Sequence, residues 1–162
     1  MSVAFDATVL VDFFNRKITG DRRAKLDDLV AMLEKSRTKI IVPTPALTEV
    51  LIRAGKARED ILRTLTGKSA FEIAPFDVKA AMECSLLLEE AWTATEKRAI
   101  TKTKFKFDWQ IVAIAATRQV TNIYSDDSDV SKAAARATIR VVRIDDLHLP
   151  PSAKQAKLDL TP

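Results

Sequence analysis

Carboxylates recur next to apolar stretches of this sequence, in places where a folded sheet could bring them together. Two positions directly follow short apolar runs that predict strands, and two lie near the starts of apolar helical stretches. These acids are Asp6, the adjacent pair Asp126 and Asp127, Glu49 and Asp108. Because the sites of open parallel sheets form at the carboxyl ends of strands, we expect the four positions to lie at one edge of a sheet.

A cluster of carboxylates implies a cation. Two unit charges about 4 Å apart repel by about 4 kcal/mol at an effective dielectric constant near 20, so gathered acids need bound cations or protons. Hard oxygen ligands favour Mg²⁺ or Mn²⁺. Such an ion can activate water and stabilise the charge that develops on a phosphodiester. The acids therefore predict metal-assisted hydrolysis of a phosphodiester bond.

Each acid taken singly also has a structural explanation. Asp108 could cap a helix, and Glu49 could be a solvated glutamate in the first turn of a helix. The aspartates that follow Ser125 could form a turn and an N-cap. Asp6 is the hardest to explain in this way, because it borders the strand expected to lie deepest in the sheet. The set, rather than any single member, indicates a site.

No other catalytic set is evident in the sequence. The chain contains one Cys and one His, so neither an intrachain disulfide nor a Cys/His zinc site can form. His148 has no evident Ser or Cys partner and is expected to be structural or exposed, while Cys84 is expected to be a small buried hydrophobe. The three glycines form no phosphate-binding loop.

Composition bounds the class of protein. The 162 residues are enough for one domain with its own core, and a hydrophobic content of 47% predicts a folded chain. The 26 basic and 22 acidic residues leave a net charge of +4, which is too small by itself to indicate nucleic-acid binding. Apolar runs are too short to cross a membrane, and Asp6 interrupts the place of a signal-peptide core. We expect a cytoplasmic protein without membrane contact.

Short apolar strands alternate with helical patterns along the chain. The expected strands are 3–5, 39–43, 71–75, 122–125 and 140–144. The expected helices are 8–15, 21–35, 45–54 after a Thr44 cap, 58–66, 78–92 after an Asp77 cap, 108–119 and 131–137. Residues 93–107 have the least regular pattern, and residues 149–162 form a tail. This alternation predicts one α/β domain over residues 1–148, with a mainly parallel sheet of about five short strands covered by helices on both faces.

Four motifs resemble the PIN domain, specifically the VapC-type ribonucleases of prokaryotic toxin–antitoxin pairs. The first family motif, roughly D-[TS]-[NS]-x-L-[VI]-D, is matched by DATVLVD at 6–12. The third, an Asp that opens a helix rich in Ile and Ala, is matched by DWQIVAIA at 108–115. The second, a Glu in the helix after the second strand, is matched by ALTEVL at 46–51, and the fourth, resembling T-x-D-x-D-F, by SDDSDV at 125–130. The resemblance covers about residues 1–148.

Departures from the family pattern are mild. Ala7 replaces a small polar residue, Thr8 replaces Asn or Ser, and Val130 replaces Phe. Ser125 stands where the family has Thr. Because Thr8 and Ser125 both keep a hydroxyl, each can still hydrogen-bond to a carboxylate or to a metal-bound water.

The resemblance implies a three-layer α/β/α PIN-like fold and a metal-dependent endoribonuclease. Its catalytic acids, which would also hold Mg²⁺ or Mn²⁺, carry over as Asp6, Glu49, Asp108 and Asp127. By the register of the fourth motif Asp127, not Asp126, takes the last position. The residues expected to support these ligands are Thr8, Ser125 and Asp129. Asp12 belongs to the first motif but lies more than a helical turn beyond the strand end, so it is expected to be structural or to contact a partner.

Partners are also implied by the resemblance. RNA is the expected substrate, and a cognate antitoxin and a second copy of the chain are expected to bind. Basic residues are expected to steer RNA to the acids, with solvated surfaces as the alternative. These residues are Arg16, Lys17, Arg53, Lys102, Lys104 and Lys106. Trp92 or Trp109 could contact a partner, although a core position is more common for tryptophan.

Two other protein classes share some of these features. A receiver-like phosphoacceptor domain is also α/β with aspartates at strand ends, but it places its paired acids after the first strand and its acceptor after the third. In this chain the paired acids come late. A non-catalytic PIN-like RNA-binding or scaffold module would keep the fold without cleaving RNA.

Overall fold

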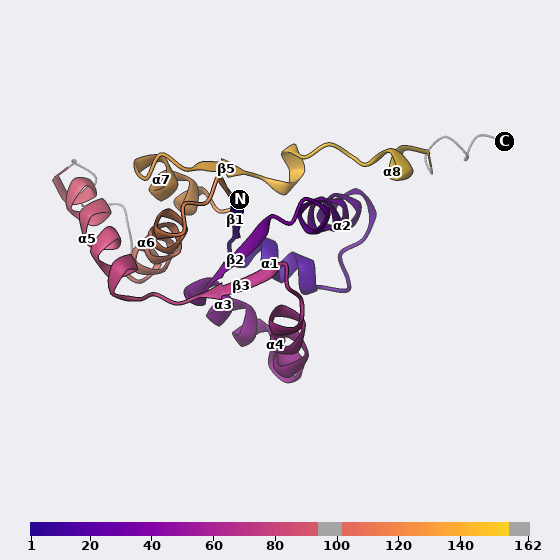
Figure 1. Cartoon of the computed structure of the whole chain (residues 1–162), viewed down its shortest axis with the longest axis horizontal. Coiled ribbons are helices and arrows are strands. Elements are labelled where there is room, and N and C mark those ends of the chain that lie inside the picture. The colour runs from indigo at the N-terminus through magenta and orange to yellow at the C-terminus, as the bar shows by residue number, and fades with distance from the viewer. Residues whose placement is uncertain (94–101, 156–162) are drawn as a thin grey trace.

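A five-stranded sheet forms the centre of the computed structural model, which describes the backbone of residues 1–93 and 102–155 and the side chains of 1–91 and 107–154 (Figure 1). The strands are β1 (Ser2–Phe5), β2 (Lys39–Pro43), β3 (Phe71–Ala74), β4 (Asn122–Tyr124) and β5 (Arg140–Val142). Their order is β3-β2-β1-β4-β5, and each of the four neighbouring pairs is parallel. The expected α/β class with a mainly parallel sheet of short strands is confirmed.

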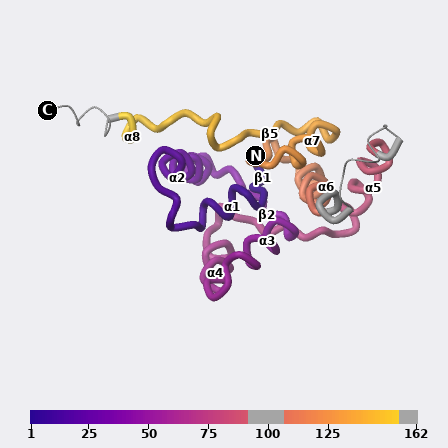
Figure 2. Tube along the Cα trace, turned by 180° about the vertical axis from the view of Figure 1, so that it is seen from behind, coloured from indigo at the N-terminus to yellow at the C-terminus, as the bar shows by residue number. Residues whose placement is uncertain are grey.

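Helices cover both faces of this sheet. They are α1 (Ala7–Phe14), α2 (Gly20–Lys35), α3 (Thr44–Ala54), α4 (Arg58–Gly67), α5 (Val78–Thr93), α6 (Lys102–Thr117), α7 (Ser128–Arg136) and α8 (Pro151–Gln155), with the 3₁₀ turns η1 (Gly55–Ala57) and η2 (Ile144–Asp146). Helices α5, α6 and α7 lie together on one side of the sheet, and α1 to α4 lie on the other (Figures 1 and 2). The result is the expected three-layer α/β/α arrangement.

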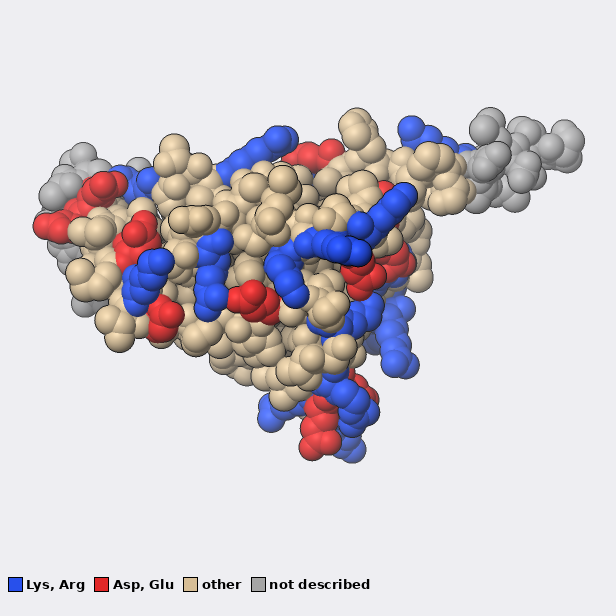
Figure 3. Space-filling view, viewed as in Figure 1, with Lys and Arg blue, Asp and Glu red and all other residues tan. Residues whose placement is uncertain are grey.

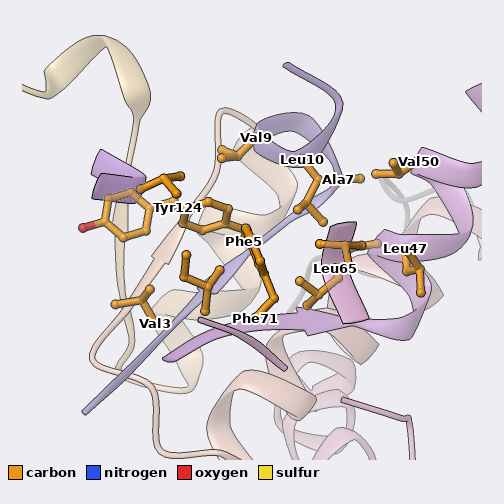
Figure 4. Close-up of a cluster of buried hydrophobic side chains, with 14 of the residues drawn as sticks. Val3, Phe5, Ala7, Val9, Leu10, Leu47, Val50, Leu65, Phe71 and Tyr124 are labelled. Carbon is orange, nitrogen blue, oxygen red and sulfur yellow. The ribbon is translucent and has the colours of Figure 1, made fainter. Parts of the chain in front are cut away.

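Side chains of the central strands alternate between two apolar clusters, one on each face of the sheet. In β1, Val3 and Phe5 belong to the cluster under α1 to α4, while Ala4 belongs to the cluster under α5 to α7. Phe5 lies in the middle of the first cluster, with Tyr124 on one side and Leu65 on the other (Figure 4). Because both faces are covered, the strands read as continuous apolar runs in the sequence.

Some element boundaries differ from the sequence-based expectation. Helix α6 begins at Lys102 rather than at Asp108, so residues 102–107 are helical although we expected an irregular stretch. This segment contains neither Gly nor Pro, and its lysines favour helix despite obscuring the apolar period. Helix α7 begins at Ser128, three residues earlier than expected, because Asp127 serves as its cap. The remainder of the irregular stretch, 94–101, lies outside the described residues.

The two expected caps had different outcomes. Asp77 accepts a hydrogen bond from the Ala80 N–H at 2.9 Å, so it caps α5 as predicted. Thr44 does not cap α3, since the helix already includes it and its side-chain oxygen accepts instead from the Phe76 N–H at 3.2 Å. This bond ties the start of α3 to the chain that follows β3.

Strand order identifies the edge of the sheet where a site can form. The chain moves from β1 outward to β3 and then returns to the other side of β1 to form β4 and β5. In open α/β sheets, ligands bind beyond the carboxyl ends of the strands at such a switch point, here between β1 and β4. The same order shows that the receiver-like interpretation is wrong, because that fold places the first strand beside the third.

The last described segment leaves the sheet after β5. It passes η2, which packs on α2, and ends in α8 at the end of the molecule far from α5 (Figures 1 and 2). Among the described residues, no helix combines the length and apolar character needed to cross a membrane.

Candidate active site

Asp6 occupies the carboxyl end of β1, at the switch point of the sheet. Its N–H still donates to the Tyr124 carbonyl of β4 at 3.2 Å, so the residue is fixed by the sheet itself. Its side chain then caps α1, with Oδ1 accepting from the Val9 N–H at 3.1 Å. Aspartate is a preferred N-cap, and the apolar residues on both sides bury it to 2% exposure.

Two hydroxyls bind the Asp6 carboxylate and connect it to the loop after β4. Thr8 Oγ1 donates to Asp6 Oδ1 at 2.7 Å, and Ser125 Oγ donates to Oδ2. The same two oxygens accept backbone bonds from the acidic pair, since the Asp126 N–H donates to Thr8 Oγ1 at 3.0 Å and the Asp127 N–H to Ser125 Oγ at 3.0 Å. Thr8 and Ser125 therefore hold the β1 and β4 ends of the site together.

Burial raises the pKa of Asp6 from 3.8 to about 6. Hydrogen bonds from Ser125, Thr8 and the Val9 N–H favour the ionised form and oppose this rise, while the nearby charge of Asp127 adds to it. The Asp6 carboxyl is thus held in a place where its own charge is costly. A cation at this position would relieve that cost.

Asp127 is the second acid that the structure brings to Asp6. It is half-buried, and its Oδ1 caps α7 by accepting from the Asp129 N–H at 2.8 Å. The Asp129 side chain itself lies 3.3 Å from Lys132 Nζ. The backbone of Asp129 thus orients the Asp127 carboxylate, while a supporting role for the Asp129 side chain stays a prediction.

Glu49 and Asp108 come from helices that pack next to this region. Helix α3 contacts both α1 and α6, so the two acid-bearing helices are neighbours. Glu49 is partly buried and lies beyond the first turn of α3. That first turn contains no acidic residue, so the interpretation of Glu49 as a solvated first-turn glutamate is wrong. Asp108 is 7% exposed and lies inside α6, so it is not an N-cap.

Arg22 of α2 binds three further acids, which are Asp12, Asp126 and Asp145. Arg22 donates from Nε to Asp12 Oδ2 at 2.7 Å, from Nη2 to Asp126, and from Nη1 to Asp145 at 3.0 Å. Burial lowers the pKa of Arg22, but the bonds to Asp126 and Asp12 outweigh it and raise the pKa above its usual value. Asp12 is thus engaged in an ion pair within the chain. A role for Arg22 was not predicted from the sequence. The one indication of such a cation was Asp12, an acid among apolar residues to which no partner had been assigned.

Comparison with solved structures identifies the fold. The chain is similar to a chain of VapBC2 from Rickettsia felis bound to a promoter DNA fragment, with a TM-score of 0.64, 15% identity, and coverage of 88% of this chain and 98% of that one. It is also similar to DNA-bound VapBC from Salmonella typhimurium, with a TM-score of 0.62, 16% identity and coverage of 89% and 98%. The chain has a PIN-like fold.

A third neighbour of this PIN-like chain is VapC20 from Mycobacterium tuberculosis, described as a toxin that cleaves the sarcin–ricin loop. The match has a TM-score of 0.58 and 13% identity, and it covers 81% of this chain and 94% of that one. No protein-family model and no curated protein matches at the level of sequence. The likeness therefore lies in the fold.

The donor chemistry of the PIN-like site fits a hard cation. The groups at the switch point are carboxylate and hydroxyl oxygens, and the most buried carboxylate is the one whose ionised form needs compensation. Within the described residues, however, no three His, Cys, Asp or Glu side chains are gathered as closely as a metal site requires. The structure brings Asp6 and Asp127 together; inclusion of Glu49 and Asp108 in a four-carboxylate site stays a prediction.

Basic residues of the PIN-like chain are only partly placed. Arg16, Lys17 and Arg53 are exposed, and Arg53 follows Glu49 by four residues in α3, which puts the two on one face of the helix. The side chains of Lys102, Lys104 and Lys106 lie outside the described ones. On the face in Figure 3, basic side chains are interspersed with acidic ones.

Three residues set aside in the sequence can now be placed. Trp109 is 6% exposed, so the idea that it contacts a partner is wrong, while the Trp92 side chain lies outside the described ones. Cys84 is buried as expected, and burial raises the pKa of its thiol. His148 is exposed.

Proposed function

We propose that this chain is a metal-dependent endoribonuclease, the toxin of a toxin–antitoxin pair. One observation carries the proposal: the buried Asp6 carboxylate at the β1/β4 switch point, with the charge of Asp127 beside it. Both positions match acids of the family motif. The fold likeness to VapC structures supports the same function.

Asp6, Asp108 and Asp127 would hold one Mg²⁺ or Mn²⁺, directly or through water, and Glu49 would complete the set or help to bind a second ion. When bound, the metal would activate the attacking water and stabilise charge on the phosphodiester. The chain's own contribution is rigidity. Thr8 and Ser125 fix both oxygens of Asp6, and the cap at α7 fixes one oxygen of Asp127.

The ionisation state of Asp6 is compatible with cation binding at neutral pH. With a pKa of about 6, the carboxyl is mostly ionised at pH 7 even before a cation binds. A bound divalent ion favours the ionised form further, because opposite charges attract. The residue is therefore ready to bind a cation without an additional base.

Exposed cations near the acids would guide the RNA backbone. Arg53 lies on the same face of α3 as Glu49. Arg16 and Lys17 follow the end of α1, a helix of eight residues and about 12 Å in length that begins directly after Asp6. Lys102, Lys104 and Lys106 would add positive charge at the start of α6. Each phosphate contact makes binding sensitive to salt.

Protein partners belong to the same proposal. A cognate antitoxin would cover the acids with cationic side chains, which form strong charge-assisted bonds with carboxylates. We also propose that the chain forms a homodimer and acts in the cytoplasm. The neighbours described as VapBC complexes support the antitoxin partner.

Cleavage of an RNA panel in the presence and absence of Mg²⁺ or Mn²⁺ tests the function. The wild-type chain should cut RNA only with metal, and Asp6→Asn should reduce the rate by about 100-fold or more, since even indirect partners of a metal site commonly cost 10–100-fold. The matched control is Asp146→Asn, an exposed acid in η2, which should cleave as the wild type does.

Two outcomes would contradict the nuclease. One is equal cleavage by the wild type and Asp6→Asn. The other is no cleavage by the wild type with either metal; if RNA then still binds, the non-catalytic PIN-like RNA-binding module becomes the better description.

A further inference from the structure

We propose that Arg22 is a positioning residue, which holds Asp126 away from the candidate cation site and thereby leaves Asp127 as the aspartate that faces Asp6. The inference rests on the proposed function for what the site binds. It concerns a residue of α2, outside the four acids and outside the motifs that suggested them.

Three separate elements meet at the Arg22 guanidinium. Asp12 comes from α1, Asp126 from the loop between β4 and α7, and Asp145 from η2. The side chains of Arg22, Asp12 and Asp126 are only 26%, 22% and 19% exposed, so the two inner pairs are partly shielded from water. Asp145 is 63% exposed and contributes less.

Asp126 is fixed at both of its ends. Its backbone N–H donates to Thr8 Oγ1 at 3.0 Å, which places the peptide against the Asp6 network. Its carboxylate is bound by Arg22 and accepts from the Ile144 N–H at 3.3 Å, with Arg143 Nε at 3.8 Å. The side chain is therefore directed to α2 and η2, while the next residue turns its carboxylate to α7 and Asp6.

Loss of the guanidinium would leave Asp12 and Asp126 as partly buried charges without their main partner. Two such carboxylates repel each other and seek solvent or another cation. The next residue is Asp127, which belongs to the proposed cation site. A released Asp126 would therefore displace Asp127 from its place beside Asp6. Arg22 thus acts on the site through Asp126 and does not contact the cation itself.

Binding of Mn²⁺ to the full-length chain tests the proposal, measured by calorimetric titration and by the electron paramagnetic resonance signal of the bound ion. Arg22→Met should weaken Mn²⁺ binding by about tenfold, at the low end of what indirect partners of metal ligands contribute. Arg22→Lys should fall between this variant and the wild type, because lysine keeps the charge but not the forked donors. The matched control is Arg63→Met, which removes an exposed pair with Asp60 in α4 and should bind as the wild type does.

A second substitution separates positioning from stability. If Arg22 works by restraining Asp126, then Asp126→Asn in the Arg22→Met background should restore most of the Mn²⁺ affinity, because the displacing charge is gone. A purely structural role predicts the opposite, since each change removes native contacts and the double variant would bind more weakly than either single one. Circular dichroism of every variant, well below its melting temperature, confirms that folded protein is compared.

Unchanged Mn²⁺ affinity in Arg22→Met overturns the proposal, and so does a double variant that binds more weakly than both single ones. If the wild type binds no Mn²⁺, the proposed function fails by itself, and amide hydrogen exchange then decides about Arg22. Faster exchange of the Asp126 and Asp127 amides in Arg22→Met, reversed by Asp126→Asn, supports the positioning role. Unchanged exchange at these amides overturns it.

Discussion

Ser125 donates its hydroxyl to the Asp6 carboxylate, joining two residues that are 119 positions apart in the chain. The same oxygen accepts from the Asp127 N–H at 3.0 Å, so one hydroxyl orients both acids at the β1/β4 junction. The Ser125 hydroxyl is therefore part of the structure that fixes the relative positions of Asp6 and Asp127.

Ser125→Ala should weaken both folding and cation binding. It removes a donor to a buried carboxylate and the acceptor of a backbone N–H, so we expect the free energy of unfolding to fall by about 1–3 kcal/mol. Urea unfolding measures this change, with Ser85→Ala as the control, because Ser85 is exposed and its hydroxyl donates to the Met82 carbonyl of its own helix, α5. Ser125→Thr, which keeps the hydroxyl, should stay close to the wild type; an equal loss in both variants would contradict this explanation.

Stability of the metal-free protein should depend on pH through Asp6. Because the pKa of Asp6 rises from its ordinary value of 3.8 to about 6 in the folded chain, the folded state binds more protons than the unfolded state between these pH values. The stabilisation is therefore complete below about pH 4 and is lost as the pH rises through about 6, with a total near 3 kcal/mol. Urea unfolding in EDTA from pH 4 to pH 7 measures it.

The Asp6→Asn variant isolates this contribution, because other carboxylates also titrate in the same range. Wild type minus variant should give a difference in unfolding free energy that declines with rising pH over this window. A difference that does not change with pH would mean that Asp6 titrates normally in the folded chain.

The two aspartates of the first motif, Asp6 and Asp12, should differ in how strongly their substitution weakens Mn²⁺ binding. Asp6→Asn should abolish most Mn²⁺ binding, whereas Asp12→Asn should leave the affinity within a few-fold of the wild type, because Arg22 keeps its bond to Asp126. Asp12→Asn should instead cost about 1 kcal/mol of stability through its partly buried ion pair. Calorimetric titration of both variants decides, and comparable losses of affinity would show that Asp12 belongs to the metal site.

Arg53 should contribute to RNA binding rather than to cation binding. Arg53→Gln is expected to reduce the slope of log K against log salt concentration by about one, as for the loss of one phosphate contact. Lys35→Gln, an exposed change at the end of α2, serves as the control. If both variants have the wild-type slope in filter-binding assays, Arg53 is a solvated residue and not an RNA contact.

The three lysines at the start of α6 allow a stronger test of RNA steering. Reversing the charge of Lys102, Lys104 and Lys106 to Glu should weaken RNA association and flatten its salt dependence, because three positive charges become negative. Cleavage rate and its salt dependence are the measurements. Unchanged values would remove these lysines from the RNA surface.

Local patterns were sufficient for the features that depend on neighbouring residues. The five strands, the position of Asp6 after β1 and the Asp77 cap all follow from short-range periodicity and capping rules. The hydroxyls of Thr8 and Ser125, expected to be able to bond a carboxylate, both do so with Asp6.

Features that depend on distant contacts were not accessible in this way. Arg22 lies 10, 104 and 123 residues from its three acidic partners, and nothing in a helical pattern reveals such a meeting. Thr44 was expected to cap its own helix but accepts from Phe76, 32 residues away. The start of α6 was misjudged for a different reason, because charged residues interrupted its apolar period.

Pairing of β1 with β4 also has a consequence for synthesis on the ribosome. Phe5 of β1 pairs with Tyr124 of β4, and the Asp6 carboxylate accepts a hydrogen bond from Ser125. Strand β1 therefore cannot form these contacts until β4 and the residue after it have been synthesised. Until residues 122–127 have been translated, a nascent chain has the first aspartate but neither its hydroxyl partner nor the neighbouring acid. A truncated translation product that ends before β4 therefore carries no assembled site.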